Sequence, residues 1–289
     1  MSEPRRLKAV SSHDTPAARQ ATDIPERAGE PPSYDTGIAH PARIYDYLLG
    51  GKENYAADRA AAEALIESGP DALPGVRANR AFLSRAVRYL AGEAGIRQFL
   101  DIGTGLPTAD NTHEVAQRVA PECRVVYVDN DPIVLAHGRA LLDSTPEGAT
   151  AYIEADARDT DLILREAAAT LDFSQPVAVM ALMVLHYIPD ADDPAPVVSR
   201  LMDAVPPGSY LAVSATTTDI NPDRVTSVAS QLNKQMGPTR ITPRTRDQIA
   251  RYFDGTDLVE PGLVHLPQWR ATADPDFVMA CLAGVGRKR

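Results

Sequence analysis

The chain has 289 residues, of which 44% are hydrophobic, and carries a formal net charge of −10. This length suits one large α/β domain with appendages or two small domains, and the acidic surface disfavours nucleic acid as a substrate. No apolar stretch reaches the roughly 18 residues of a membrane span and the N-terminus lacks an apolar signal core, so we expect a cytoplasmic protein with no membrane contact.

The N-terminal third divides into two predicted parts. Residues 1–36 mix charges, Pro, Ser and Ala without apolar periodicity, which predicts a disordered tail. Residues 37–95 are expected to form a helical lid or substrate cap ahead of the first strand. Within it, Ile44, Tyr45, Leu48 and Leu49 share one helical face, and Gly50-Gly51 ends that helix. Two further helices are predicted, over 56–67 and 76–91.

A glycine turn follows the first predicted strand, 98–102, and has two interpretations. A dinucleotide fingerprint would place glycine at position 108, where this chain has Thr108. A methyltransferase first motif, acid-x-G-x-G-x-G, matches at Asp101, Gly103 and Gly105 but has Pro107 in place of its third glycine. Asp101 favours the second interpretation, because a carboxylate repels a diphosphate but suits the ammonium and sulfonium groups of S-adenosylmethionine.

Strands and helices alternate through residues 96–289, which we expect to form one cofactor-binding domain. Asn111-Thr112-His113-Glu114 predicts a capping box at the start of a helix that Pro121 closes. The other expected helices are 132–142, 160–169, 194–204 and one that Thr242-Pro243 begins and Tyr252 ends. The expected strands are 98–102, 124–129, 151–155, 177–185, 210–214, 257–264 and 276–284. Seven strands in this order predict an α/β fold, a doubly wound Rossmann-like sheet closed by an antiparallel strand pair.

Four stretches together resemble the class I S-adenosylmethionine-dependent methyltransferases. The resemblance is closest to a bacterial family of uncharacterised members that carries the block PARIYDYLLGGKEN. The stretches are His40–Asn54, Phe99–Thr108, Val126–Pro132 and Val184–Asp190, and Leu258–Gly262 also fits. The resemblance implies the fold and S-adenosylmethionine as cofactor. We therefore expect a methyl group to pass to a small-molecule acceptor at oxygen or nitrogen, whose identity the family does not supply.

The same resemblance implies where the cofactor binds. Asp101, Gly103, Thr104 and Gly105 would line its amino-acid end. Asp129 would accept the ribose hydroxyls, since a carboxylate accepts two hydrogen bonds at once. Asn130 is expected near the adenosine, although turn chemistry also accounts for it. Asp156 and Ala157 match the site that recognises the adenine edge.

Four basic side chains are further candidates for the expected site. Arg43, in the block before the first strand, and Arg80 are the candidates to pair with the cofactor's methionine carboxylate, with Lys52 as a further one. His186 follows the fourth strand, where its near-neutral pKa suits a base that takes a proton from the acceptor. The alternative is a histidine that only packs at the strand end or forms part of the cofactor wall.

Other functions are left open by the sequence. Pro107 and the lack of an evident general base also permit a non-catalytic sensor or partner subunit that binds S-adenosylmethionine or S-adenosylhomocysteine. A nicotinamide-dependent dehydrogenase is less favoured, because of Thr108 and Asp101. No metal-ligand spacing is visible, so no metal is expected, and Cys123 and Cys281 are interpreted as reduced core residues. Whether the protein forms a homodimer is left open.

Overall fold

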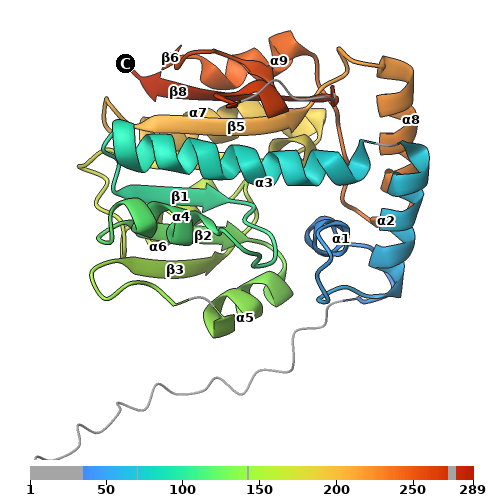
Figure 1. Cartoon of the computed structure of the whole chain (residues 1–289), viewed down its shortest axis with the longest axis horizontal. Coiled ribbons are helices and arrows are strands. Elements are labelled where there is room, and N and C mark those ends of the chain that lie inside the picture. Colours follow the sequence, from blue (N-terminus) through green and yellow to red (C-terminus); the bar gives the residue numbers. More distant parts are fainter. Residues whose placement is uncertain (1–34, 70, 142, 273–277) are drawn as a thin grey trace, which may run out of the picture. The chain divides into compact units, whose positions relative to one another are not determined.

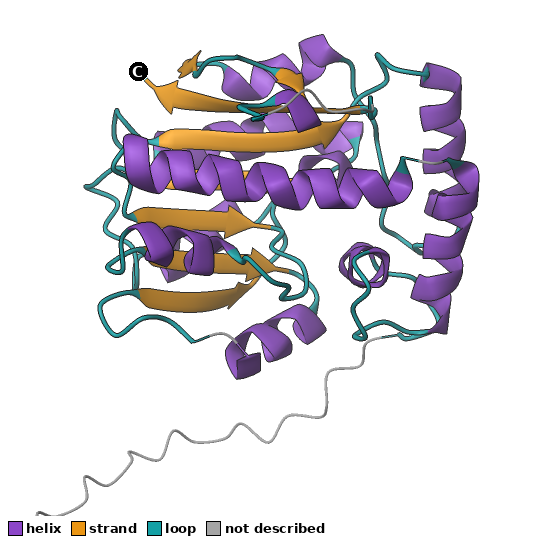
Figure 2. Ribbon diagram, in the orientation of Figure 1, coloured by secondary structure: helices purple, strands orange, loops and turns teal. Residues whose placement is uncertain are grey.

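A mixed β-sheet forms the centre of the protein (Figure 1, Figure 2). The computed structural model describes residues 35–69, 71–141, 143–272 and 278–289. Within these residues, eight strands pair in the order β3-β2-β1-β4-β5-β8-β6, and β7 also pairs with β8. Their bounds are β1 Gln98–Ile102, β2 Arg124–Asp129, β3 Ala149–Glu154, β4 Ala178–Leu182, β5 Tyr210–Thr216, β6 Thr256–Leu258, β7 Val264–His265 and β8 Cys281–Lys288.

Strands β1 to β5 are parallel, and β8 runs antiparallel to β5. Parallel strands are covered by helices on both faces, so the interior residues of β1, β2 and β4 are mostly apolar. Successive residues of β1 point to opposite sides of the sheet: Leu100 belongs to one apolar core and Phe99 to the other. The predicted doubly wound α/β sheet with an antiparallel closing strand is therefore confirmed.

Each face of the sheet has its own layer of helices. Residues of α3 and α4 pack with Phe99, and residues of α6, α7 and α9 pack with Leu100. Helix α5 lies at the edge beside β3 (Figure 1). The bounds are α3 Ala72–Arg88, α4 Thr112–Val119, α5 Pro132–Leu141, α6 Thr160–Ala167, α7 Pro194–Asp203 and α9 Arg246–Ala250.

Three more helices lie beyond the carboxyl ends of the parallel strands, at the right of Figure 1. They are α1 Pro41–Leu48, α2 Ala56–Ser68 and α8 Pro222–Asn233. A small apolar core joins them, in which Ile44 and Leu48 of α1 meet Ala61 of α2 and Leu232 of α8. The carboxyl end of a parallel sheet is where α/β proteins bind ligands, so these helices cover the expected site.

Two buried carboxylates organise the block that contains α1. Asp46 accepts hydrogen bonds from the Glu53 amide at 2.9 Å and from the Asn54 side chain at 2.8 Å. A Cβ at Gly51 would lie 1.9 Å from the Asp46 carboxylate, so the chain closes over this side chain only with glycine there. Asp58 similarly accepts from the amide of His40 at 2.8 Å. These bonds fold residues 40–58 into a fixed unit.

The structure corrects several predicted boundaries. The strand predicted over 177–185 ends at Leu182, because Met183 adopts a φ of 55° and a 3₁₀ turn follows. The strand predicted over 257–264 is divided into β6 and β7, since Pro261 and Gly262 form a turn between them. This division makes eight strands of the predicted seven.

Other boundaries shift along the chain. The last strand, predicted over 276–284, begins at Cys281 and continues to Lys288, while residues 276 and 277 lie outside the described part. The helix predicted from Thr242 begins at Arg246, because Thr245 rather than Thr242 provides its capping box. Helix α8 was not predicted at all. Of the tail predicted over 1–36, all but residues 35 and 36 lies outside the described residues.

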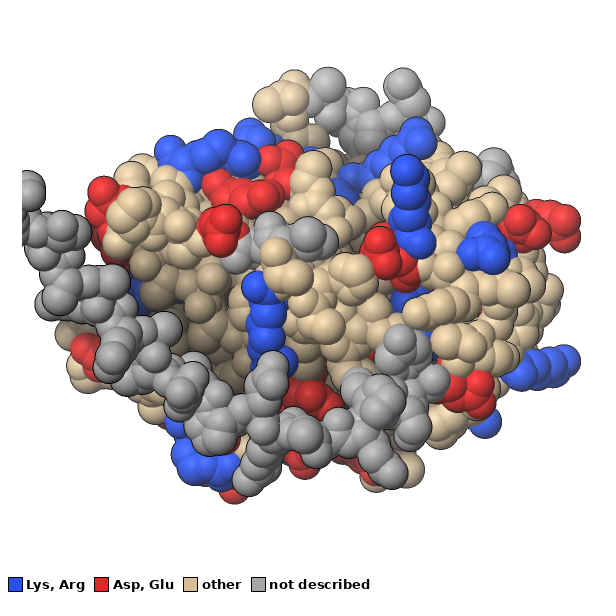
Figure 3. Space-filling view, turned by 90° about the horizontal axis from the view of Figure 1, so that it is seen from below, with Lys and Arg blue, Asp and Glu red and all other residues tan. Residues whose placement is uncertain are grey.

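The charges of the described residues are mixed in sign on the face that Figure 3 shows. Basic and acidic side chains are interspersed there with uncharged surface. Among the described residues, we find no helix with both the length and the apolar character to span a bilayer.

Candidate active site

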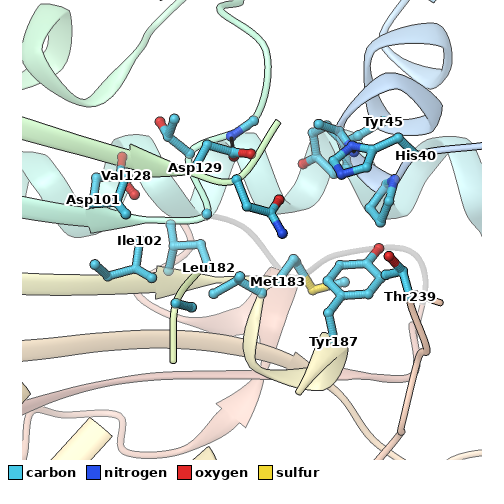
Figure 4. A pocket seen from close by; sticks show the side chains of 18 of the residues that line it. His40, Tyr45, Asp101, Ile102, Val128, Asp129, Leu182, Met183, Tyr187 and Thr239 are labelled. Carbon is cyan, nitrogen blue, oxygen red and sulfur yellow. Dashed lines mark hydrogen bonds between the residues drawn. The ribbon is translucent and has the colours of Figure 1, made fainter. Parts of the chain in front are cut away.

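A cavity of about 450 Å³ opens at the carboxyl ends of the parallel strands. Its size lies in the usual range for small-ligand sites. On one side are Asp101 and Asp129, at the ends of β1 and β2, and facing them are His40 and Tyr45 from the region of α1 (Figure 4). The predicted residues that line the cavity are Arg80, Asp101, Gly103, Thr104, Gly105, Asp129, Asn130, Asp156 and Ala157.

The two glycines of the turn serve different purposes. Both have a positive φ, 69° at Gly103 and 68° at Gly105, which favours glycine. A Cβ at Gly103 would come within 2.4 Å of the Val184 side chain, so the space beside Gly103 is already filled by another residue of the protein. A Cβ at Gly105 would meet no atom within 4 Å, and Gly105 lines the cavity. The open space above Gly105 is therefore available to a ligand.

Asp129 connects the glycine turn to the turn after β2. One carboxylate oxygen accepts from the Gly105 amide at 2.9 Å and the other from the Asp131 amide at 3.0 Å. Burial raises the pKa of Asp129, and these two hydrogen bonds act in the opposite direction. Because a carboxylate offers about four acceptor positions, two remain for hydroxyl groups of a ligand.

Asp101 is a deeply buried carboxylate of the cavity, 4% exposed at the end of β1. The Thr112 hydroxyl donates to it at 2.6 Å, from the first turn of α4. Burial raises the pKa of Asp101 to about 6, and the Thr112 bond and nearby Arg80 lower it in part. A cationic group beside Asp101 would favour the charged carboxylate.

Replacement of Asp101 by asparagine is expected to raise the melting temperature near pH 8 and to change it little near pH 4. Between pH 3.8 and about pH 6, the folded protein holds a proton on Asp101 that the unfolded chain has released. The stability from this proton is complete below the unfolded pKa and is lost as pH rises through the folded pKa. Asparagine avoids the buried charge. At a pH above both pKa values, this raises the free energy of unfolding by at most about 3 kcal/mol.

Thermal unfolding of both proteins across this pH range, without added ligand, measures the difference. Asparagine retains an oxygen that accepts from Thr112. A variant that is less stable than the wild type at the alkaline end would show that Asp101 is ionised without penalty, contrary to its burial.

Asp156 is held by a neighbouring arginine. Its two oxygens accept from Arg158 Nε and Nη2, each at 2.8 Å, and Oδ1 also accepts from the Arg158 amide at 2.9 Å. The side-chain bonds with Arg158 lower the pKa of Asp156. Arg158 in turn contacts Asp192 at 2.5 Å. The loop after β3 is thereby fixed, with Ala157 lining the cavity.

The two predicted arginines have different positions. Arg80 lines the cavity, where its Nη2 donates to the carbonyl groups of Ala109 at 2.9 Å and Asp110 at 2.8 Å. Arg43 is not among the described residues that line it. Its Nε lies 3.3 Å from Asp58 and 3.9 Å from Asp131, so Arg43 instead connects α1 to the start of α5.

His186 is 3% exposed and lies in the 3₁₀ turn after β4. Burial lowers its pKa to about 3, and nearby Arg244 adds to the effect. The ring is therefore neutral near pH 7. Its Nδ1 has no hydrogen-bond partner among the described residues. His186 lines a second cavity that adjoins the first.

Several lining residues were not predicted as part of the site. Met183 and Tyr187 follow β4, and Thr239 comes from the loop after α8; Figure 4 shows Tyr187 between Met183 and Thr239. No motif marks Thr239, and the helix before it was not predicted. Among the described residues, no group of three His, Cys, Asp or Glu side chains is placed to hold a metal ion.

The chain is similar in sequence and fold to known methyltransferase-related proteins. A family described as S-adenosyl methyltransferase matches residues 27–289. The fold is similar to that of a DUF574 family protein from Streptomyces avermitilis, with 47% identity, a TM-score of 0.85, and 88% of this chain and 99% of that chain covered. It is also similar to a protein from Thermobifida fusca that is proposed to be a methyltransferase, with 43% identity, a TM-score of 0.81, and coverage of 88% and 96%. No curated protein matches the chain.

Proposed function

Because the chain belongs to the S-adenosyl methyltransferase family, we propose that it transfers a methyl group from S-adenosylmethionine to a small-molecule acceptor, at oxygen or nitrogen. S-adenosylmethionine is the methyl donor of this family. The observation that carries the proposal is the cavity of about 450 Å³ in which the glycine turn, Asp101 and Asp129 meet.

The residues of this cavity fit the cofactor's groups. Two acceptor positions of Asp129 suit the vicinal hydroxyls of a ribose. The open space above Gly105 leaves room for the cofactor to lie against the protein backbone. Asp101 provides negative charge for an ammonium group, and Arg80 is the cavity arginine for a carboxylate. Asp156 and Ala157 remain the proposed contacts of the adenine ring, and Asn130 that of the adenosine.

The cofactor supplies an activated sulfonium methyl group, so the protein needs only to position the reactants and exclude water. Helices α1, α2 and α8 provide that cover over the strand ends. His186 is the proposed hydrogen-bond partner of the acceptor. With a pKa of about 3, it accepts a hydrogen bond but does not store a proton near neutral pH.

The proposed partners are small molecules rather than nucleic acid or a membrane. The net charge of −10 and the interspersed charges in Figure 3 support this, since a phosphate backbone binds to clustered basic side chains. We also propose a cytoplasmic location. Cys123 and Cys281 are both free and buried, as is usual in a reducing compartment.

Calorimetric titration with S-adenosylhomocysteine tests the cofactor site, and methyl-labelled S-adenosylmethionine with a metabolite extract tests transfer. We expect saturable one-to-one binding and a labelled small-molecule product. Binding with no labelled product from any extract would favour the non-catalytic sensor. Absence of binding by a folded protein would overturn the proposed function.

A further inference from the structure

A second cavity, of about 210 Å³, adjoins the first. Both cavities are lined by Pro41, Tyr45, Asn79, Met183 and Tyr187. The second cavity lies between α1, α3 and α8 at the carboxyl end of β5, where Thr216 lines it. A ligand in this space is therefore next to the cofactor cavity.

The lining of this second cavity is largely apolar. Branched aliphatic side chains come from α1, α2, α3, α8 and the loops that flank α8, and sulfur-bearing side chains come from the strand ends and from the loop after α8. The aliphatic residues are Ile44, Leu48, Leu65, Val76, Ile220, Val225, Val228, Leu232 and Ile241, and the sulfur-bearing residues are Met183, Met236, Met279 and Cys281. Thioether groups make favourable contacts with aromatic rings and adapt to their shape.

The polar groups of the cavity carry no net charge. Burial raises the pKa of the Cys281 thiol to about 12, so the thiol is neutral. Asp71 and Arg224 line the cavity as an ion pair with each other. His186, which also lines it, is neutral and has an unpartnered Nδ1. A buried nitrogen without a partner costs free energy that a ligand hydrogen bond would recover.

Met183 lies on the wall between the two cavities in an uncommon conformation. Its φ of 55° belongs to the left-handed region, which few residues other than glycine adopt. Its amide donates to the Ser214 carbonyl at 2.9 Å, which fixes the turn. Such backbone conformations occur often at ligand sites.

From this arrangement we propose that the second cavity binds the methyl acceptor, and that the acceptor is a compact uncharged aromatic compound with one hydroxyl or amine group bonded to His186. This inference rests on the proposed function. In the reaction, the acceptor's lone pair forms the bond to the methyl carbon, the electron pair of the carbon–sulfur bond goes to sulfur, and the acceptor's proton leaves to water.

The probe for this cavity is 2-naphthol, titrated by calorimetry into protein saturated with S-adenosylhomocysteine. Val228→Lys, which places a charge on the cavity wall, is expected to weaken 2-naphthol binding at least about tenfold. Ser227→Lys is the matched control, because Ser227 is exposed on the same helix and does not line the cavity. Both variants should bind S-adenosylhomocysteine as the wild type does, which also verifies folding.

Two further comparisons sharpen the test. Val225→Trp fills the cavity without adding charge and should weaken 2-naphthol binding as well. His186→Phe should reduce the affinity for 2-naphthol to that for naphthalene, a loss of about three- to tenfold for one hydrogen bond.

The outcomes separate this inference from the proposed function. If S-adenosylhomocysteine binds but 2-naphthol does not, the acceptor assignment is overturned and the proposed function stands. Equal 2-naphthol affinity in Val228→Lys and Ser227→Lys would also overturn it, as would naphthalene-2-carboxylate binding as tightly as 2-naphthol. If S-adenosylhomocysteine itself fails to bind, the proposed function fails first.

Discussion

Replacement of Asp129 by alanine is expected to weaken S-adenosylhomocysteine binding by at least about 100-fold, because hydrogen bonds to a charged group contribute about 1.5–3 kcal/mol each. In the proposed complex, the carboxylate accepts both ribose hydroxyls. It also holds the amides of Gly105 and Asp131, so its loss removes ligand contacts and loosens both turns. Calorimetric titration of the wild type and the variant measures the difference.

Asp129→Asn is the matched control for shape. The amide keeps one acceptor oxygen but presents a donor where the carboxylate had its second, so we expect an intermediate loss. Circular dichroism of both variants verifies that they are folded. Wild-type affinity in a folded Asp129→Ala protein would show that the ribose is held elsewhere.

Replacement of Asp58 by alanine is expected to lower the free energy of unfolding by about 3–5 kcal/mol, the range for removing one member of a buried ion pair. Asp58 is fully buried and accepts from the amides of His40 and Tyr55, each at 2.8 Å. Without it, Arg43 keeps a buried charge whose nearest described carboxylate, Asp131, lies 3.9 Å away. The melting temperature should fall by about 10 °C.

Two controls identify the cause of this loss. Arg43→Met in the Asp58→Ala background removes the uncompensated charge and should restore part of the stability. Asp161→Ala removes an exposed carboxylate that is paired with Arg200 at 2.8 Å, and should cost less than about 1 kcal/mol. If Asp58→Ala and Asp161→Ala unfold at the same temperature, the buried pair does not stabilise the N-terminal block.

The central strands were predictable because their ends are marked in the sequence. The strands 98–102 and 124–129 are apolar runs that end beside glycine or aspartate, and the structure has both with these bounds. The capping box that begins at Asn111 is likewise local, and it is present. Local signals of this kind depend on the backbone of a few adjacent residues.

Helix α8 was not predicted, although it carries a local signal. Val225, Val228, Ala229 and Leu232 recur at the spacing of one helical face, and Pro222 stands at the first helical position. Its packing against α2, about 160 residues earlier in the chain, is a tertiary contact that no local pattern marks. The strand expected to reach Leu185 ends earlier because Met183 adopts a positive φ and a 3₁₀ turn follows, so that Met183 and Val184 line the cofactor cavity and Leu185 returns to the core.

The candidate site shows the same division. Asp101, Asp129 and the glycines were identified because they lie at strand ends, where topology brings them together. Arg43 and Arg80 were indistinguishable in the sequence, since each is a basic residue on a predicted helix. Only the tertiary structure shows that Arg43 lies beside Asp58, while Arg80 lines the cavity. Burial likewise lowers the pKa of His186 to about 3, which makes it a weak proton acceptor near neutral pH.

The position of α8 outside the sheet has a consequence for how such enzymes diversify. Under the proposed assignment, the donor is held by strand ends that the folding core requires, whereas one wall of the acceptor cavity is a peripheral helix. Exchanging the residues of α8 that face this cavity would then alter substrate preference while sparing the nucleoside pocket. On this assignment, α8 is the segment to randomise in directed evolution of acceptor preference.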